Sequence, residues 1–140
     1  MKKQILTILF AMAFVMNCAN EEESLEINGS YTDAYATSHT ISNDTWINGS
    51  SSYTIVSYNN DINTIIAQNG TDNQFNPNKF SKFNYTDRSA DGKFYHCTVA
   101  YNAASLEAVI SVADADSSNP GTSGCGSFAW TQMTSGTGIN

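Results

Sequence analysis

Basic residues are scarce in this chain. Six lysines and arginines stand against thirteen aspartates and glutamates, so the formal net charge is −7. Two of the basic residues, Lys2 and Lys3, belong to a predicted leader; without them four remain against the same thirteen, a net charge of −9. Nucleic acids and anionic lipid headgroups repel a chain of this charge. We therefore exclude nucleic acid as a partner.

Histidines are also few, and this argues against most enzyme classes and metal centres. The chain has only His39 and His96, contains no G-x-S-x-G or C-x-x-C motif, and has no metal-type spacing between a histidine and a cysteine. Residues 114–119 resemble half of a calcium loop, but Asn119 and Cys125 stand where an EF-hand loop needs glycine and glutamate. We predict no enzyme, no metal and no cofactor, and interpret both histidines as solvated or hydrogen-bonded strand residues.

The one long apolar run, residues 5–16, is too short to span a bilayer as a helix. It follows two lysines, so we interpret residues 1–17 as a secretory signal peptide. Bacterial lipoprotein signals end in a small apolar box before a cysteine that carries the lipid, and here the box reads Val15-Met16-Asn17-Cys18. Asn17 departs from the strict pattern. We expect a lipid on Cys18 that anchors the protein in a membrane; the alternative is cleavage nearby, which leaves a free thiol.

Four glutamates follow Cys18 closely, and a run of like charges is usually a solvated segment. We therefore expect an acidic tether over residues 18–28. Residues 29–134 are long enough to form a single domain with a buried core, and residues 135–140 read as a flexible tail.

Two cysteines remain for the domain, Cys97 and Cys125. Export places them in an oxidising compartment, where pairing is favoured. Such a disulfide contributes roughly 3–4 kcal/mol in the chain-entropy model, a large share of a small domain's stability. The alternatives are two free thiols or a two-cysteine metal site.

Leucine is rare after residue 20, and the apolar residues are mostly Ile, Val, Phe, Tyr and Trp, which is typical of strands. Alternating patterns bounded by turn residues predict strands at residues 30–41 (one or two), 52–58, 62–68, 80–86, 93–101 and 125–133. Asn59-Asn60-Asp61 and Asp91-Gly92 predict the turns of two hairpins.

A single helix is predicted late in the chain. Asn102 can cap it, and apolar residues recur at helical spacing from Ala103 to Ala113. Consecutive hairpins with one helix before the last strand predict a mainly β fold, an antiparallel sheet closed into a small barrel or sandwich of calycin-like type.

The aromatic residues have two interpretations, core or contact surface. On strand 93–101, Tyr95, Cys97 and Tyr101 share a face that we predict to be the core face, with His96 on the opposite face. Trp130 is also predicted to be core. The residue types leave Trp46 open. Two polar loops, residues 43–51 with Trp46 and 70–78 with Phe75, are therefore the candidate partner-binding segments.

Several stretches together resemble a known family. They are Gly29-Ser30-Tyr31-Thr32-Asp33, Ile65-Ile66-Ala67-Gln68-Asn69, Phe80-Ser81-Lys82-Phe83-Asn84-Tyr85-Thr86, Tyr95-His96-Cys97 with Tyr101-Asn102-Ala103-Ala104, and Gly124-Cys125-Gly126-Ser127-Phe128-Ala129-Trp130-Thr131. In this order they resemble short leptospiral (spirochaetal) lipoproteins of uncharacterised function. That family tends to have Trp at positions 80 and 85 and Arg at 82, where this chain has Phe, Tyr and Lys.

The resemblance implies an outer-membrane or surface lipoprotein in which Cys97 and Cys125 are paired, and it supplies no catalytic residue. By analogy with leptospiral surface lipoproteins, we expect an adhesin-type interaction module that contacts a host or other extracellular protein. The alternative is a small lipocalin-like barrel that carries a hydrophobic ligand in the cell envelope.

Overall fold

The structure is a computed structural model, and it describes residues 23–136. The predicted signal peptide (residues 1–17), the lipidation site Cys18 and the last four residues of the predicted tail lie outside this range.

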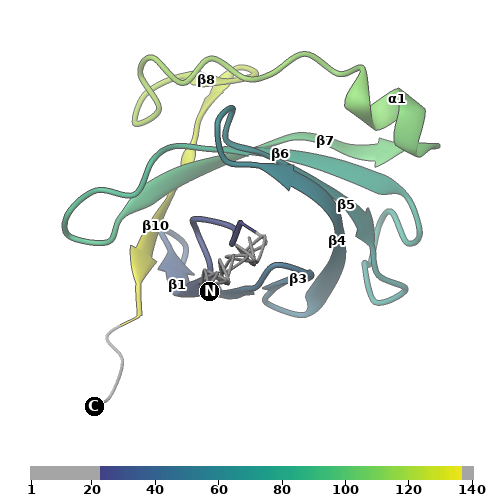
Figure 1. Ribbon diagram of the computed structural model, residues 1–140, viewed down its shortest axis with the longest axis horizontal. Helices are drawn as coiled ribbons and strands as arrows, with labels where there is room; N and C mark the ends of the chain where they lie inside the picture. Colours follow the sequence, from purple (N-terminus) through teal and green to yellow (C-terminus); the bar gives the residue numbers. More distant parts are fainter. Residues whose placement is uncertain (1–22, 137–140) are drawn as a thin grey trace, which may run out of the picture.

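Eight antiparallel strands close into a barrel, seen end-on in Figure 1. Each strand pairs with the next one along the chain, and the last pairs with the first, so that Tyr31 lies opposite Ser135. The strands are β1 (Gly29–Asp33), β2 (Ser38–Ile41), β3 (Thr45–Asn48), β4 (Ser51–Asn59), β5 (Thr64–Asn69), β6 (Phe80–Tyr85), β7 (Phe94–Ala103) and β10 (Thr131–Ser135). The mainly β class and the barrel are confirmed. Within the part of the chain that the structure describes, closure leaves the barrel sheet without an open edge.

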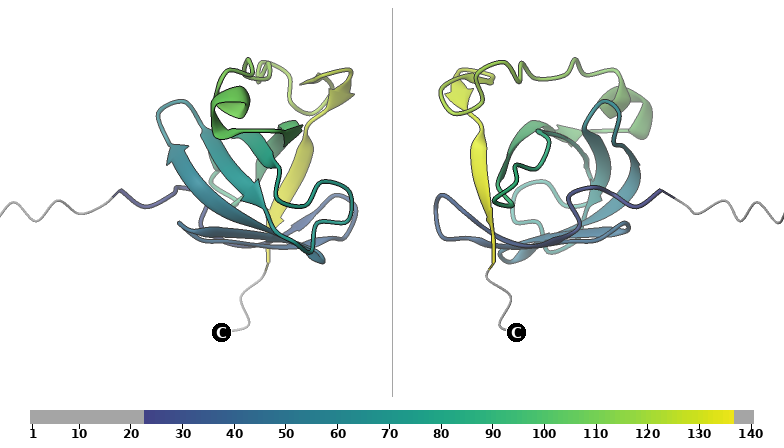
Figure 2. Two further views of the ribbon diagram at one scale, coloured as in Figure 1. Left: turned by 90° about the vertical axis from the view of Figure 1, so that its right-hand side faces the viewer. Right: turned by 60° about the vertical axis from the view of Figure 1, so that its left-hand side comes forward.

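Between β7 and β10 the chain leaves the barrel and runs over its outer surface (Figure 2). This excursion, residues 104–130, holds α1 (Leu106–Ile110) and a small hairpin of β8 (Gly124–Cys125) and β9 (Phe128–Ala129). The single late helix is confirmed, but its predicted start was wrong. Ser105 caps it, because β7 runs on to Ala103 and pairs there with Phe80. Among residues 23–136 no helix has the length and apolar character needed to cross a membrane.

The disulfide is confirmed and ties β7 to β8, with the Cα atoms of Cys97 and Cys125 5.5 Å apart. The predicted core face of β7 was wrong. Phe94 and His96 are buried in the barrel, whereas Cys97 faces outward and Tyr101 is exposed. The excursion covers part of the outer face of β7, so both faces of the strand carry apolar residues. Alternation therefore does not tell which face is inside.

Two strand predictions were also wrong in detail. β3 lies within the segment that was interpreted as a polar loop, because its four residues are too few to show alternation. The predicted strand 125–133 is divided into β8, β9 and the start of β10. Gly126 lies in the turn between β8 and β9 with a φ of 59°, a conformation that favours glycine.

The tether is shorter than the predicted residues 18–28, because the last residues of that segment belong to the barrel core. Leu25 and Ile27 are 1% and 0% exposed and close one end of the barrel. Asn43 Oδ1 accepts from the Leu25 N–H (3.0 Å), and Asn60 Oδ1 accepts from the Glu26 N–H (3.1 Å). We call this the proximal end; it also holds the turns 42–44 and 59–63 and the loop 86–93. In Figure 1 the N-terminal segment lies across it. At the other end of the chain, β10 includes Ser135, which had been assigned to the tail.

Large side chains fill the barrel lumen. The largest fully buried ones among the described residues include Trp46, Tyr85, Phe83, Phe94, Leu25, Ile27, Ile65 and Met133. Their rings are in contact: Trp46 and Phe83 have centroids 4.6 Å apart, and Tyr31 and Phe94 meet edge to face at 4.9 Å. An eight-stranded barrel is just wide enough for side chains to fill it, and this one is filled.

The position of Ile27 predicts that the proximal segment contributes to stability. Ile27→Ala should lower the free energy of unfolding by about 2–4 kcal/mol, through lost burial and the cavity that remains. Its exposed neighbour provides the control: Glu26→Ala should change the value by less than about 0.5 kcal/mol. Urea unfolding followed by tryptophan fluorescence measures both. Equal midpoints for Ile27→Ala and wild type would show that the segment is not part of the core.

Candidate functional site

A polar cluster lies within the lumen, formed by Asp33 on β1, His39 on β2 and Trp46 on β3. The Trp46 indole N–H donates to His39 Nδ1 (3.0 Å), and His39 Nε2 lies 3.2 Å from Asp33 Oδ2. Because Nδ1 accepts a hydrogen bond, Nε2 carries the proton and donates to the carboxylate. Both ring nitrogens of His39 are thus occupied. His39 is hydrogen-bonded, as predicted, but it is buried.

Asp33 also fixes the turn between β1 and β2. Its Oδ1 accepts from the backbone N–H groups of Tyr35 (2.9 Å) and Thr37 (2.8 Å). Burial raises the pKa of the Asp33 carboxyl, but the hydrogen bonds from Thr37, His39 and Tyr35 outweigh it, and the pKa lies below its usual value. The charged form therefore holds the turn and His39 together.

The second histidine, His96 on β7, is buried beside this cluster. Its ring lies 5.1 Å from that of Trp46 and 5.9 Å from that of His39. Neither ring nitrogen has a hydrogen-bond partner among the described residues. Burial, aided by the proximity of His39, lowers the pKa of His96 to about 4. The ring is therefore neutral at physiological pH.

The side chains of the lumen cluster bond to one another. His39 has no free ring nitrogen, and the sulfur of Cys97 is bonded to Cys125. Residues 23–136 contain no group of three or more His, Cys, Asp or Glu side chains that could hold a metal ion. We interpret the cluster as the polar part of the core, which orients Trp46 and closes the β1–β2 turn.

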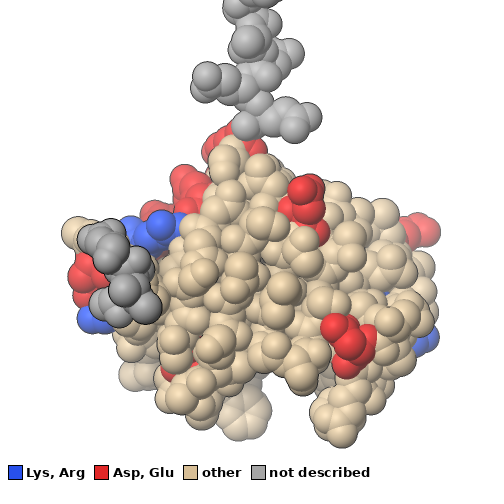
Figure 3. All heavy atoms as spheres, turned by 90° about the horizontal axis from the view of Figure 1, so that it is seen from below, with Lys and Arg blue, Asp and Glu red and all other residues tan. Residues whose placement is uncertain are grey.

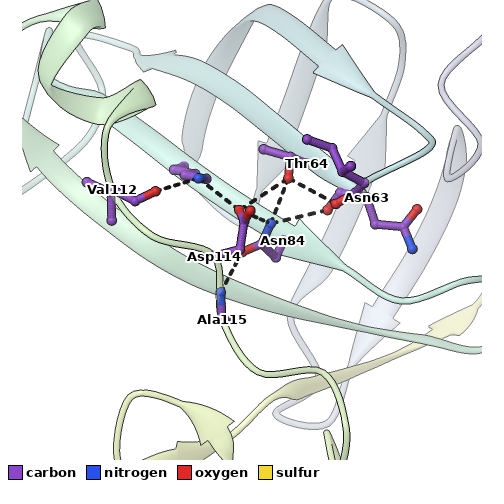
Figure 4. Close-up of polar contacts among 8 residues, drawn as sticks. Asn63, Thr64, Asn84, Val112, Asp114 and Ala115 are labelled. Carbon is purple, nitrogen blue, oxygen red and sulfur yellow. Dashed lines mark hydrogen bonds and ion pairs between the residues drawn. The ribbon is translucent and has the colours of Figure 1, made fainter.

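A second polar cluster lies outside the barrel, where the excursion crosses β5 and β6 (Figure 4). Lys82 Nζ is 2.8 Å from Asp114 Oδ1 and donates to the Val112 carbonyl (2.6 Å). Asn84 Nδ2 donates to the same Asp114 oxygen (3.0 Å), and Asn84 Oδ1 accepts from the Ala115 N–H (2.9 Å). Hydrogen bonds from Lys82 and Asn84 lower the pKa of Asp114. The first carboxylate of the half calcium loop is thus part of an ion pair.

This outer cluster holds the excursion to the barrel and was not predicted from the sequence. The signal was present in the pattern Phe80-Ser81-Lys82-Phe83-Asn84-Tyr85, where a lysine and an asparagine alternate with aromatic residues. Lys82 and Asn84 are both buried, which is unusual for outward-facing strand residues. Beside the cluster, a hollow of about 360 Å³ on the outer surface is lined by Ile62, Ile66 and Ile110.

Two exposed aromatic side chains lie at the end of the barrel opposite the N-terminal segment. We call this end the distal rim: the turns 34–37 and 49–50 and the loop 70–79. Hydrogen bonds from the Gly49 N–H to the Ser38 carbonyl (2.9 Å) and from the Gly70 N–H to the Ser52 carbonyl (2.8 Å) hold it together. The largest side chains of the rim are those of Tyr35 and Phe75. Tyr35 is 81% exposed and Phe75 is 80% exposed.

The loop that carries Phe75 is fixed in place by hydrogen bonds. The amide of buried Asn69 donates to the carbonyls of Asn76 (2.8 Å) and Tyr101 (3.0 Å). Asp72 Oδ1 accepts from the N–H and the hydroxyl of Ser52 (3.1 and 2.9 Å). The aromatic side chain is therefore presented from an ordered loop, which reduces the entropy lost when a partner binds.

The two candidate partner-binding residues have different positions. Phe75 lies on the distal rim and is available to a partner. Trp46 is 1% exposed in the lumen, so the proposal that it contacts a partner at the surface was wrong. Its indole fills the space between β3 and β6 and donates a hydrogen bond to His39. The polar residues around Trp46 in the sequence did not indicate this buried position.

Comparison with known proteins gives no match to any family model, any curated protein or any solved structure.

The neutral state of His96 predicts a pH dependence of stability. Its pKa is about 4 when folded and near 6.5 when unfolded, so the unfolded chain takes up the proton first as the pH falls. Stability should be complete above pH 6.5 and fall by up to about 3 kcal/mol towards pH 4. Urea unfolding between pH 7.5 and 4.5 measures the free energy of unfolding of wild type and of His96→Phe. The variant should lack the part of the acid-induced loss that comes from His96. The same loss in both proteins would contradict the assignment.

Proposed function

We propose that this protein is a cell-envelope lipoprotein whose barrel serves as a non-enzymatic, adhesin-type interaction module. A lipid on Cys18 holds it to the outer membrane, and the distal rim contacts a host or other extracellular protein. The observation that carries the proposal is that the N-terminal segment and the exposed aromatic residues lie at opposite ends of the barrel. The N-terminal segment is bound at the proximal end, and exposed aromatic residues lie at the opposite end.

The filled lumen supports a function on the outer surface. Ligand-carrying barrels keep an apolar cavity in the interior, whereas here aromatic and aliphatic side chains occupy that space. The lipocalin-like carrier therefore has less support than the interaction module. Exposed, well-positioned aromatic residues are the side chains that contribute most to protein interfaces, and Tyr35 and Phe75 are of this kind.

The anchor is tested on the protein extracted from its native membrane in mild detergent. Cys18 lies seven residues before Leu25, so a lipid there places the proximal end towards the membrane. We expect an intact mass raised by acyl chains, and we expect Cys18→Ser to move the protein from the membrane fraction to the soluble fraction. An unmodified Cys18 in the wild-type protein would contradict the anchor.

The rim is tested by substituting its aromatic side chains. Binding of wild type to immobilised serum and extracellular-matrix proteins should weaken at least about tenfold in Tyr35→Ser/Phe75→Ser, because each such residue contributes roughly 1–2 kcal/mol. Ile62→Ser is the control, since Ile62 is an exposed apolar residue at the proximal end. Unchanged binding by the double variant, or an equal loss in the control, would exclude the rim.

A further inference from the structure

The hollow on the outer surface beside Lys82 is bordered by isoleucine side chains. Ile66 is the buried, outward-facing residue of β5 between Ser57 and Lys82 on the neighbouring strands. Ile62 from the turn 59–63 and Ile110 at the end of α1 also line the hollow, and they are 59% and 57% exposed. We call this site the isoleucine hollow. Exposed apolar side chains grouped around a concave surface mark a site that binds an apolar group.

The isoleucine hollow offers no free charge. Its one charged residue is Lys82, whose ammonium is already held by Asp114 and the Val112 carbonyl. Three other surface hollows contain carboxylates: Asp61 and Asp114 in the first, Glu23 and Asp44 in the second, Glu26 and Asp87 in the third. Figure 3 shows acidic side chains on another face of the barrel as well. In this acidic protein, the isoleucine hollow is therefore a place where an uncharged apolar chain meets no carboxylate.

The N-terminal segment is bound at the border of the same hollow. Tyr58 lines the hollow, and its hydroxyl donates to the Glu23 carbonyl. The Asn60 amide donates to the Ser24 carbonyl (2.9 Å), and Figure 2 shows the described chain starting at this end of the barrel. Cys18 precedes Glu23 by five residues, which span at most roughly 17 Å. A chain attached to Cys18 is therefore within reach of the hollow.

These features point to one occupant, which belongs to the protein itself. An acyl chain is apolar and uncharged, and its exposure to water is unfavourable. We propose that the isoleucine hollow holds an acyl chain of the lipid on Cys18 while the protein is in water, before it reaches the membrane. The inference rests on the lipid proposed above. A bilayer buries the whole chain, so the chain leaves the hollow when the protein becomes anchored.

The hollow is tested separately from the anchor by attaching one alkyl chain to the protein in vitro. The chain has three cysteines, and Cys97 is paired with Cys125. Cys18 is therefore the one thiol of residues 18–140 that a maleimide can modify. N-dodecylmaleimide adds the long chain, and N-ethylmaleimide adds the same ring without it and serves as the control.

Isoleucine methyl NMR spectra of these two proteins locate the chain. The methyl signals of Ile62, Ile66 and Ile110 should differ between the dodecyl and ethyl proteins and should show contacts to the methylene groups of the chain. The signal of Ile47 should be the same in both, because Ile47 is an exposed isoleucine of β3 and does not line the hollow.

Binding to phosphatidylcholine vesicles measures the competition between the hollow and a bilayer. A chain held in the hollow must leave it before it inserts, so shelter lowers the apparent affinity for vesicles. Dodecyl-modified Ile62→Asn/Ile110→Asn should bind vesicles at least about threefold more tightly than the modified wild type. Dodecyl-modified Ile47→Asn should bind as the modified wild type does. Both replaced hollow residues are more than half exposed, so the barrel core stays intact.

Any of four results would overturn the proposal. They are equal spectra for the dodecyl and ethyl proteins, changes at Ile47 as large as those at Ile66, equal vesicle binding by wild type and the double variant, or changes that grow with protein concentration and so place the chain on a second copy. An unmodified Cys18 in the native protein would instead remove the occupant and contradict the anchor. Because the alkylated protein reports on the hollow alone, the two failures are distinguishable.

Discussion

Closure of the barrel is the constraint on which the rest of the structure depends. When β10 pairs with β1, every strand of the barrel has two neighbours, and the inner face of each is enclosed by the other barrel strands. The enclosed space is then filled from two sources, the inward-facing aromatic residues of the strands and the N-terminal segment with Leu25 and Ile27. Because the segment before β1 belongs to the core, the domain begins earlier than the acidic composition suggests.

The lumen accepts polar groups only where they are held in place. Asp33 and His39 form a chain that ends on the Trp46 indole, so burial of these groups is offset by hydrogen bonds and a charge-assisted contact. His96 is buried with no such partner among the described residues, and its ring remains in the neutral form. Outside the barrel the same rule applies to Lys82, whose ammonium is held by Asp114 and the Val112 carbonyl.

The excursion between β7 and β10 adds a second layer to a small single-layer barrel. The disulfide and the Lys82–Asp114 pair fasten it at two places, and beneath it the outer faces of β5, β6 and β7 carry buried residues. The opposite wall has no such cover and carries uncharged hydroxyls. The barrel therefore has four distinct surfaces: a proximal end closed by the N-terminal segment, a distal rim with aromatic residues, a wall covered by the excursion and an uncovered wall.

The sequence by itself determined the β class, the hairpins on either side of Asn60 and Gly92 and the single late helix, because each depends on local pattern. It favoured a disulfide but left two free thiols or a metal site open, and the structure decided the pairing of Cys97 with Cys125. Only the tertiary structure decided which face of β7 is inside, that Trp46 is core, and that Leu25 and Ile27 close the barrel. Alternation shows that a strand has two faces but does not say which one other segments cover. The segments that cover a strand face are distant in the chain. The excursion covers the outer face of β7, and β6 and His39 pack against Trp46.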